Sequence, residues 1–144
     1  MPKKEYKPRE WRLVYEFLIT NFRNCLQWRR VRVGPIYKNE KLYQVVRRWA
    51  DAIVYCAKED IVYIIEAKMK PEPGGISQLE LYIKLFPKTP EFEMLKDKRV
   101  KGIYLTTQDD PELRELAKSK GIEYVVYQPD WVKEYWKERL EKYG

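Results

Sequence analysis

Residues 49–68 decide the fold. The stretch reads Trp49-Ala50-Asp51-Ala52-Ile53-Val54-Tyr55-Cys56, then a polar Lys58-Glu59-Asp60, then Ile61-Val62-Tyr63-Ile64-Ile65-Glu66-Ala67-Lys68. Both apolar runs are rich in β-branched and aromatic residues, so they predict two antiparallel strands joined by a tight turn. A two-residue loop at 58–59 and a four-residue loop at 57–60 give the same pairing. On either loop, Asp51 lies directly across from Glu66.

Three charged side chains therefore share one face of the predicted hairpin. The β-carbons of Asp51 and Glu66 are expected to lie roughly 5 Å apart, and strand alternation puts Lys68 on the same face. Two carboxylates repel by roughly 4 kcal/mol at about 4 Å and an effective dielectric constant of about 20. A divalent cation would turn this repulsion into attraction, so the spacing predicts a metal site. The alternative for Asp51 is a structural ion pair with Lys68 or an arginine.

The composition excludes several kinds of active site. The 144 residues are enough for a single domain, 1–144, and a hydrophobic content of 44% excludes a disordered chain. The chain has no histidine and only two cysteines, Cys25 and Cys56. Ser-His and Cys-His catalysis, ordinary zinc sites and four-cysteine iron–sulfur clusters are therefore excluded. Catalysis would have to use carboxylates, lysine, tyrosine and a hard cation bound by oxygen.

The net charge of +7 favours a polyanionic partner. Basic residues concentrate in the first third of the chain, where tyrosines and tryptophans are interleaved with them, a mixture that suits phosphate neutralisation and base stacking. A charged surface rich in lysine and glutamate, as in proteins from hot environments, is the alternative. The side chains that we single out for DNA binding are Arg30, Arg32, Arg47, Arg48 and Lys70. Without an apolar span or a secretory signal, we expect a soluble, cytoplasmic protein with no membrane partner.

The pattern of the remaining elements predicts a mixed sheet flanked by helices. The first helix is expected over 9–22, with Trp11, Val14, Tyr15, Leu18 and Phe22 as its apolar stripe. Another begins at Ser77, which forms a capping box with Glu80, after a loop at 71–75. The last begins near Asp130, with Val132, Tyr135, Trp136 and Leu140 as its core side. The other expected elements are strands near 28–33, 42–48, 100–106 and 122–127, and a short helix from Asp110-Pro111 to Gly121.

A second polar signal lies on the helix that follows the hairpin. Gln78 and Tyr82 are one turn apart and share a helical stripe with Leu81 and Leu85. A glutamine on an apolar stripe is either a buried amide satisfied by the backbone or a functional group. In the functional interpretation, Gln78 in the first helical turn holds a phosphate or orients Lys68.

Taken together, Asp51, Glu66-Ala67-Lys68 and Gln78-Leu79-Glu80-Leu81-Tyr82 resemble the PD-(D/E)XK nuclease superfamily. The Gln-x-x-x-Tyr element resembles its RecB-like branch. The resemblance covers roughly residues 9–127 and implies an α/β, restriction-endonuclease-like fold with a mixed β-sheet flanked by helices and the core order α-β-β-β-α-β. The motif departs from the common pattern in having Ala50 before Asp51, where many members have proline. The cysteines of the iron–sulfur subgroup and a helicase segment are absent from this sequence.

The resemblance also implies roles for individual residues. Asp51 and Glu66 would be Mg²⁺ or Mn²⁺ ligands, together with the Ala67 carbonyl. Lys68 would be the catalytic lysine, while Gln78 and Tyr82 would bind the substrate and shape the site. Relatives often add an acidic residue from the first helix, for which Glu16 is the candidate; its alternative is an ordinary solvated glutamate.

The implied function is a metal-dependent deoxyribonuclease that hydrolyses DNA phosphodiester bonds at DNA ends or on single strands, as an exonuclease does. A junction-resolving endonuclease of the same superfamily is one alternative. A noncatalytic nucleic-acid-binding module on the same fold is another, and a structural protein with an ion-pair network at Asp51 and Lys68 is a third. DNA is the expected partner. Each nuclease hypothesis allows a homodimer and a separate helicase or recombination partner.

Overall fold

The computed structural model describes residues 7–36 and 47–143 of the chain. One five-stranded sheet, in the order β1-β2-β3-β4-β5, forms its centre. The strands are β1 (Leu26–Val33), β2 (Arg48–Cys56), β3 (Ile61–Lys68), β4 (Arg99–Thr106) and β5 (Ile122–Val126). The helices are α1 (Pro8–Asn21), α3 (Pro73–Leu85), α4 (Pro111–Ser119) and α5 (Asp130–Tyr143), with short 3₁₀ turns at Phe86–Lys88 and Pro90–Leu95.

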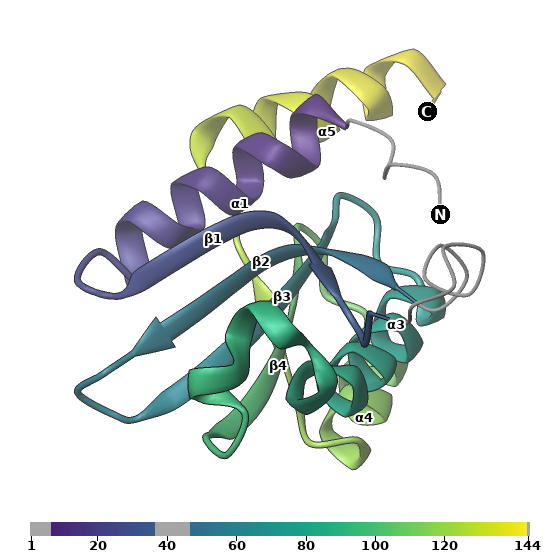
Figure 1. Cartoon of the computed structure of the whole chain (residues 1–144). Helices are drawn as coiled ribbons and strands as arrows, with labels where there is room; N and C mark the ends of the chain where they lie inside the picture. The colour runs from purple at the N-terminus through teal and green to yellow at the C-terminus, as the bar shows by residue number, and fades with distance from the viewer. Residues whose placement is uncertain (1–6, 37–46, 144) are drawn as a thin grey trace.

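Helices cover both faces of the sheet. Figure 1 shows α1 and α5 side by side on one face and α3 and α4 on the other. β1, β2 and β3 pair antiparallel, whereas β4 is parallel to β3 and β5 is parallel to β4. Two buried cores result: an α3-side core that includes Ile64, Leu79 and Tyr82, and an α1-side core that includes Leu18 and Val132. The predicted α/β class and element order are confirmed.

The predicted register of the β2–β3 hairpin is also confirmed. Cys56 pairs with Ile61 across a four-residue loop, and the ladder continues to Ala52 opposite Ile65. Asp60 closes the loop in the left-handed region, with φ 58°. Continued by one residue, the same register sets Asp51 opposite Glu66.

One segment differs from the predicted pattern, and another lies largely outside the described residues. The strand expected at 42–48 falls largely outside the described residues, and β2 begins at Arg48. α3 begins at Pro73 rather than Ser77, so the predicted capping box of Ser77 and Glu80 is wrong. The sequence Pro73-Gly74-Gly75 was expected to be a loop. It forms the first helical turn because proline at the first position needs no backbone N–H partner.

The later elements follow the prediction closely. The Asp110 side chain caps α4 by accepting hydrogen bonds from the backbone N–H groups of Glu112 and Leu113, and Gly121 ends the segment with φ 71°. Val132 of α5 is buried as expected, whereas Leu140 is 71% exposed and belongs to no core. No helix in the described residues has both the length and the apolar character that crossing a bilayer requires.

A disulfide joins Cys25 to Cys56 across a sequence separation of 31 residues. The two cysteines continue the β1–β2 ladder by one residue beyond the pair Leu26 and Tyr55, so register alone brings them together. Constraining a loop of this length in the unfolded chain contributes roughly 3–4 kcal/mol in the chain-entropy account. The disulfide therefore fixes β1 on β2 at the end of the sheet opposite Asp51.

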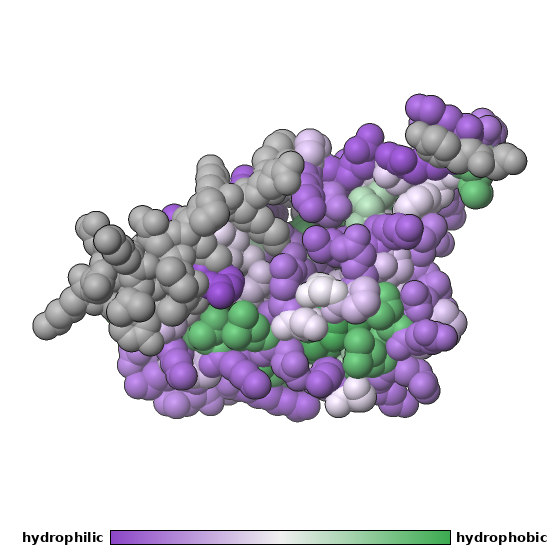
Figure 2. Space-filling view, turned by 90° about the vertical axis from the view of Figure 1, so that its right-hand side faces the viewer, coloured by the Kyte–Doolittle hydropathy of each residue, from purple (hydrophilic) through white to green (hydrophobic). Residues whose placement is uncertain are grey.

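The surface beside α3 and α4 is mixed in character. Figure 2, which looks onto the right-hand side of Figure 1, shows a mostly hydrophilic face with hydrophobic residues gathered in its lower half. Leu81 of α3 and Leu116 of α4 are among the exposed large hydrophobic side chains, at 38% and 37% exposure.

Candidate active site

The candidate site lies where β2 and β3 separate. Their ladder ends at Ala52 and Ile65. Beyond this pair, residues 48–50 of β2 still pair with β1, and residues 66–68 of β3 still pair with β4. A fork therefore opens between the two central strands. In the fork, the Ala67 N–H donates a 2.7 Å hydrogen bond to Asp51 Oδ2. A carboxylate thus takes the place of a backbone acceptor and bridges the two strands.

The backbone is irregular at this point on both β1 and β2. Arg30 lies opposite Asp51, between the pairs Arg29–Ala52 and Val31–Ala50. Its φ angle is 53°, which is unusual for a residue other than glycine. Ala50 and Ile53, three residues apart, both pack in the α3-side core. A regular strand would send them to opposite faces. Ala52 packs in the α1-side core, so the break in alternation falls between Ala50 and Ala52, at Asp51.

Asp51, Glu66 and Lys68 line one small pocket. Glu66 is only 1% exposed, and Lys68 is half-buried at the end of β3. The pocket encloses about 30 Å³, which is room for one or two water molecules or an ion. In the described part of the chain, no ion pair joins Lys68 to Asp51 or Glu66. The lining residues are Lys7, Glu10, Trp11, Val14, Arg29, Arg30, Asp51, Glu66, Ala67 and Lys68.

Of the two predicted α3 residues, the structure brings only Tyr82 to the carboxylates. Tyr82 is 4% exposed. Burial, and then the negative charges of Glu66 and Asp51, raise its pKa far above the usual value, while the Arg48 charge lowers it. Gln78 is exposed and does not line the pocket, so the expectation that it lies on the buried stripe of the helix is wrong. The buried face of α3 runs instead through Gly75, Ile76, Leu79 and Tyr82.

Tyr104 of β4 packs next to the site, and the sequence does not indicate this role. It pairs with Glu66 in the parallel β3–β4 register. Its hydroxyl accepts from the Glu72 N–H at 2.8 Å and donates to the Glu72 carbonyl at 3.1 Å. Burial raises the pKa of Tyr104 to about 12, so the phenol stays protonated and can donate. Tyr104 thereby fastens the start of α3 to the strand next to Glu66.

Glu16 is not at the pocket, and this prediction needs correction. Both of its carboxylate oxygens accept from the Trp131 indole N–H, at 3.0 and 2.9 Å, and one pairs with Arg12 at 3.1 Å. The acidic residue of α1 that does line the pocket is Glu10. Six residues separate the two, which places their side chains about 120° apart around the helix at 3.6 residues per turn. Glu10 precedes the buried Val14 by one helical turn, and this spacing in the sequence indicates that Glu10 lies on the same side of α1.

The five predicted DNA-binding residues divide into two groups. The prediction that Arg47 contacts DNA at the surface is wrong. Arg47 is 1% exposed, and its guanidinium donates hydrogen bonds to Glu91 Oε1 at 2.6 Å and to the Arg32 carbonyl. Burial opposes and the Arg47 hydrogen bond favours ionisation of Glu91, and the net effect lowers the pKa of that carboxyl. The others are at or near the surface. Arg30 lines the pocket, Arg32 lies over the Trp49 ring, Arg48 is close to Tyr82 and Lys70 is exposed.

The pocket residues could hold a metal ion only through oxygen ligands. Within residues 7–36 and 47–143, no group of three or more His, Cys, Asp or Glu side chains forms a metal cluster. Asp51 and Glu66 provide two carboxylates, and Glu10 of α1 lines the same pocket without forming a three-acid group with them. In a strand, the N–H and C=O of one residue point the same way, so the Ala67 carbonyl is expected on the Asp51 side as well. The donor set fits a hard cation such as Mg²⁺ or Mn²⁺, which prefers oxygen.

Comparison with known proteins supports the fold. No family model and no curated protein matches the chain. A repair endonuclease from Pyrococcus abyssi is similar in structure, with a TM-score of 0.53 and 16% identity over 90% of this chain and 50% of that chain. EndoMS in a complex with double-stranded DNA has a TM-score of 0.51 and 15% identity over 90% of this chain and 49% of that chain. A protein of unknown function has a TM-score of 0.56 and 12% identity over 84% of this chain and 60% of that chain.

These similarities establish a restriction-endonuclease-like fold. This chain spans about half the length of both endonucleases.

Proposed function

We propose that this protein is a metal-dependent nuclease that hydrolyses DNA phosphodiester bonds. The observation that carries the proposal is the fork between β2 and β3, where Asp51 faces Glu66 and Lys68 lines the same pocket. A structural ion pair with Lys68 is a weaker explanation, because Lys68 makes no ion pair with either acid in the described chain. Asp51 and Glu66 line the same pocket and Glu66 is only 1% exposed, so a divalent cation between the two carboxylates would offset their mutual repulsion.

The cofactor in this proposal is Mg²⁺ or Mn²⁺. Asp51, Glu66 and the Ala67 carbonyl would hold it, and Glu10 replaces Glu16 as the contribution of the first helix. When bound, the cation would polarise the phosphodiester and offset the negative charge that develops during hydrolysis. The hydrogen bond from the Ala67 N–H already fixes Asp51 Oδ2, so part of the ligand set is ordered before a cation arrives.

The protein side chains would then act on the phosphate and the attacking water. Lys68 would hold the water or stabilise the charge on the phosphoryl oxygens. Tyr82 remains a neutral phenol next to two acids, so it would serve as a hydrogen-bond donor rather than as a base. Lys7, Arg29 and Arg30 at the pocket rim would attract the flanking phosphates.

The substrate class follows from two separate arguments. The Gln-x-x-x-Tyr resemblance to the RecB-like branch favours action at DNA ends or on single strands. The exposed Gln78 would then meet the substrate outside the pocket. The structural neighbours, a repair endonuclease and EndoMS, favour the alternative of internal cleavage. A junction-resolving endonuclease is one form of that alternative.

Labelled DNA substrates separate these possibilities. Linear, covalently closed circular and branched DNA are incubated with the protein and Mg²⁺ or Mn²⁺, and the products are resolved on gels. An end-dependent nuclease degrades the linear DNA and spares the closed circle. Cleavage of circles or branches would assign an endonuclease instead. If every substrate survives both cations although the protein still binds DNA, the noncatalytic module is the correct account and the nuclease proposal is wrong.

A further inference from the structure

An exposed aromatic pair on α1 stands at the mouth of the candidate site. We propose that Trp11, Tyr15 and Arg29, here called the α1 platform, stack an unpaired nucleobase of the strand whose phosphodiester is cleaved. This inference rests on the proposed nuclease function and names the part of the substrate that the site recognises.

The exposure of the two rings is the first observation. Trp11 and Tyr15 are each 38% exposed, although the helical pattern predicted them as core residues. The core of α1 is formed instead by Leu13, Val14, Phe17 and Leu18. Ile19, at 43% exposure, continues the same surface stripe one turn further along the helix. Large exposed aromatic side chains in a row are unusual unless they bind something.

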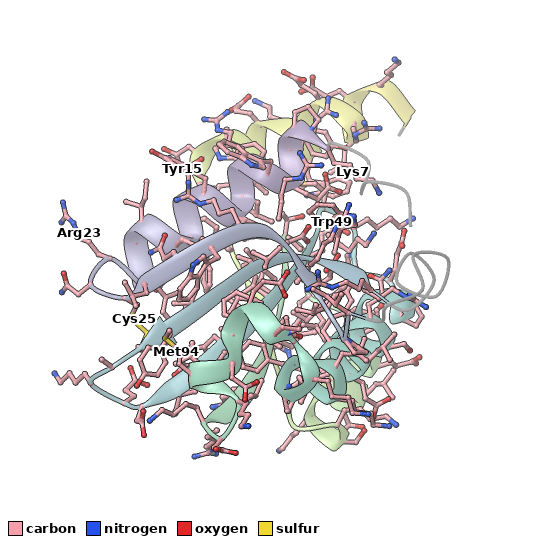
Figure 3. All side chains as sticks on the ribbon, in the orientation of Figure 1. Lys7, Tyr15, Arg23, Cys25, Trp49 and Met94 are labelled. Carbon is pink, nitrogen blue, oxygen red and sulfur yellow. A yellow bond between two sulfur atoms is a disulfide. The ribbon has the colours of Figure 1, made fainter. Side chains whose placement is uncertain are left out.

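The rings are already ordered for stacking. The Trp11 and Tyr15 ring centroids are 5.5 Å apart with planes inclined by 10°, a parallel stack. The Arg29 guanidinium lies 4.6 Å from the Tyr15 ring centroid. The platform therefore combines aromatic faces with a fixed positive charge, the combination by which proteins bind the bases and backbone of single strands. In Figure 3, Tyr15 lies beside α1, and Lys7 marks the end of this helix nearer the N-terminus.

The platform is continuous with the site. Trp11 and Arg29 line the pocket together with Asp51, Glu66 and Lys68. The pocket volume of about 30 Å³ suits an ion and water. In the proposed complex a phosphate reaches the acids, and Trp11, which lines the same pocket, receives the neighbouring base.

Charge favours DNA over a second copy of this chain as the occupant. Lys7, Arg29 and Arg30 surround the platform side of the pocket, whereas a like-charged surface opposes self-association. A second cation–aromatic pair, Arg32 over Trp49 at 4.8 Å, lies further along β1 beyond Arg30. Aromatic and basic groups thus stand on both sides of the Asp51 position along the strand, as a bound strand would require.

The stacked base must be unpaired. In a duplex both faces of a base are covered by its neighbours, and a side chain can stack only on a base that is single-stranded, frayed or extruded. The platform therefore predicts a preference for single strands, frayed ends or flipped bases.

Equilibrium binding of a labelled single-stranded oligonucleotide, in the presence of a chelator so that no cleavage occurs, tests the platform. Trp11→Ala and Tyr15→Ala should each weaken binding roughly tenfold or more, whereas Trp11→Phe and Tyr15→Phe should keep most of the affinity because they keep a ring. Ile19→Ala is the matched control, since it removes an exposed apolar side chain from the same stripe. It should change the affinity less than about twofold. Thermal unfolding of each variant verifies that it is folded.

The outcomes distinguish the platform from the nuclease proposal. If both alanine variants bind single strands as Ile19→Ala does while the unaltered protein cleaves DNA, the platform is wrong and the nuclease proposal stands. If the unaltered protein does not cleave DNA, the nuclease proposal is wrong whatever the variants bind. If Trp11→Ala instead dissociates a dimer at unchanged DNA affinity, the stripe is a protein interface and the platform is overturned.

Discussion

Replacing Lys68 by alanine is expected to lower the rate of DNA cleavage by about 10²- to 10⁴-fold, the range found when a positioned proton-transfer or charge-stabilising group is lost. Lys68 lines the pocket with Asp51 and Glu66 without an ion pair to either acid in the described chain. In the proposed mechanism the ammonium group acts on the substrate rather than neutralising a carboxylate. Initial rates on labelled DNA at saturating Mn²⁺ give the measurement.

Lys70→Ala is the matched control for this variant. Lys70 carries the same charge two residues further on, but it is exposed and does not line the pocket. Its loss should change the cleavage rate only a few-fold, through weaker attraction of DNA. Equal cleavage by the unaltered protein and Lys68→Ala would mean that another site, or a contaminant, performs the reaction.

Gly75→Ala is expected to cause the largest loss of stability among single methyl additions at the site. A β-carbon at position 75 would lie 2.2 Å from Cε1 of Tyr104. The Tyr104 ring cannot yield easily, because it is fully buried and its hydroxyl is held by two hydrogen bonds to Glu72. Overpacking of this kind costs about 1–3 kcal/mol. Chemical denaturation should therefore show a lower unfolding free energy with an unchanged denaturant dependence.

Gly74→Ala gives the opposite expectation one residue away. A β-carbon there has no heavy atom within 4 Å, and alanine favours a helix over glycine by roughly 0.5–1 kcal/mol. This variant should be as stable as the unaltered protein or slightly more stable. If both alanine variants are equally stable, the close packing of α3 on Tyr104 is not as described.

The hairpin could be predicted from sequence because its information is local. The two apolar runs, the short polar turn and period-two alternation are enough to fix the register, and with it the position of Asp51 opposite Glu66. The helix capped by Asp110 is of the same kind, because its capping side chain and the following Pro111 are adjacent in sequence. These predictions needed no knowledge of distant contacts.

The errors arose where distant residues decide the outcome. Whether Arg47 meets solvent depends on Glu91, 44 residues away. The exposure of Trp11 and Tyr15 depends on which side of α1 faces the sheet, and a stripe of aromatic residues is compatible with either side. Sequence alone does not separate Glu16 from Glu10, because only the packing of α1 places Glu16 against Trp131 and Glu10 at the pocket. Tyr104 gave no signal, since its role depends on Glu72 and Gly75 lying above it.

Asp51 also has a structural role that sequence did not suggest. Its carboxylate accepts the Ala67 N–H across the fork, so Asp51→Ala would remove a charge-assisted hydrogen bond as well as a proposed metal ligand. The stability of that variant mixes two effects, and relief of carboxylate repulsion would be partly hidden. Glu66→Gln, which preserves shape and changes only charge, is the cleaner substitution for metal binding.

Isothermal titration with Mn²⁺ or Mg²⁺ tests whether Asp51 and Glu66 hold a divalent cation. We expect saturable binding to the unaltered protein and an affinity lowered by at least about tenfold in Glu66→Gln. The Lys68→Ala variant should still bind. Absence of saturable binding to the unaltered protein, or equal affinity in Glu66→Gln, would contradict the claim.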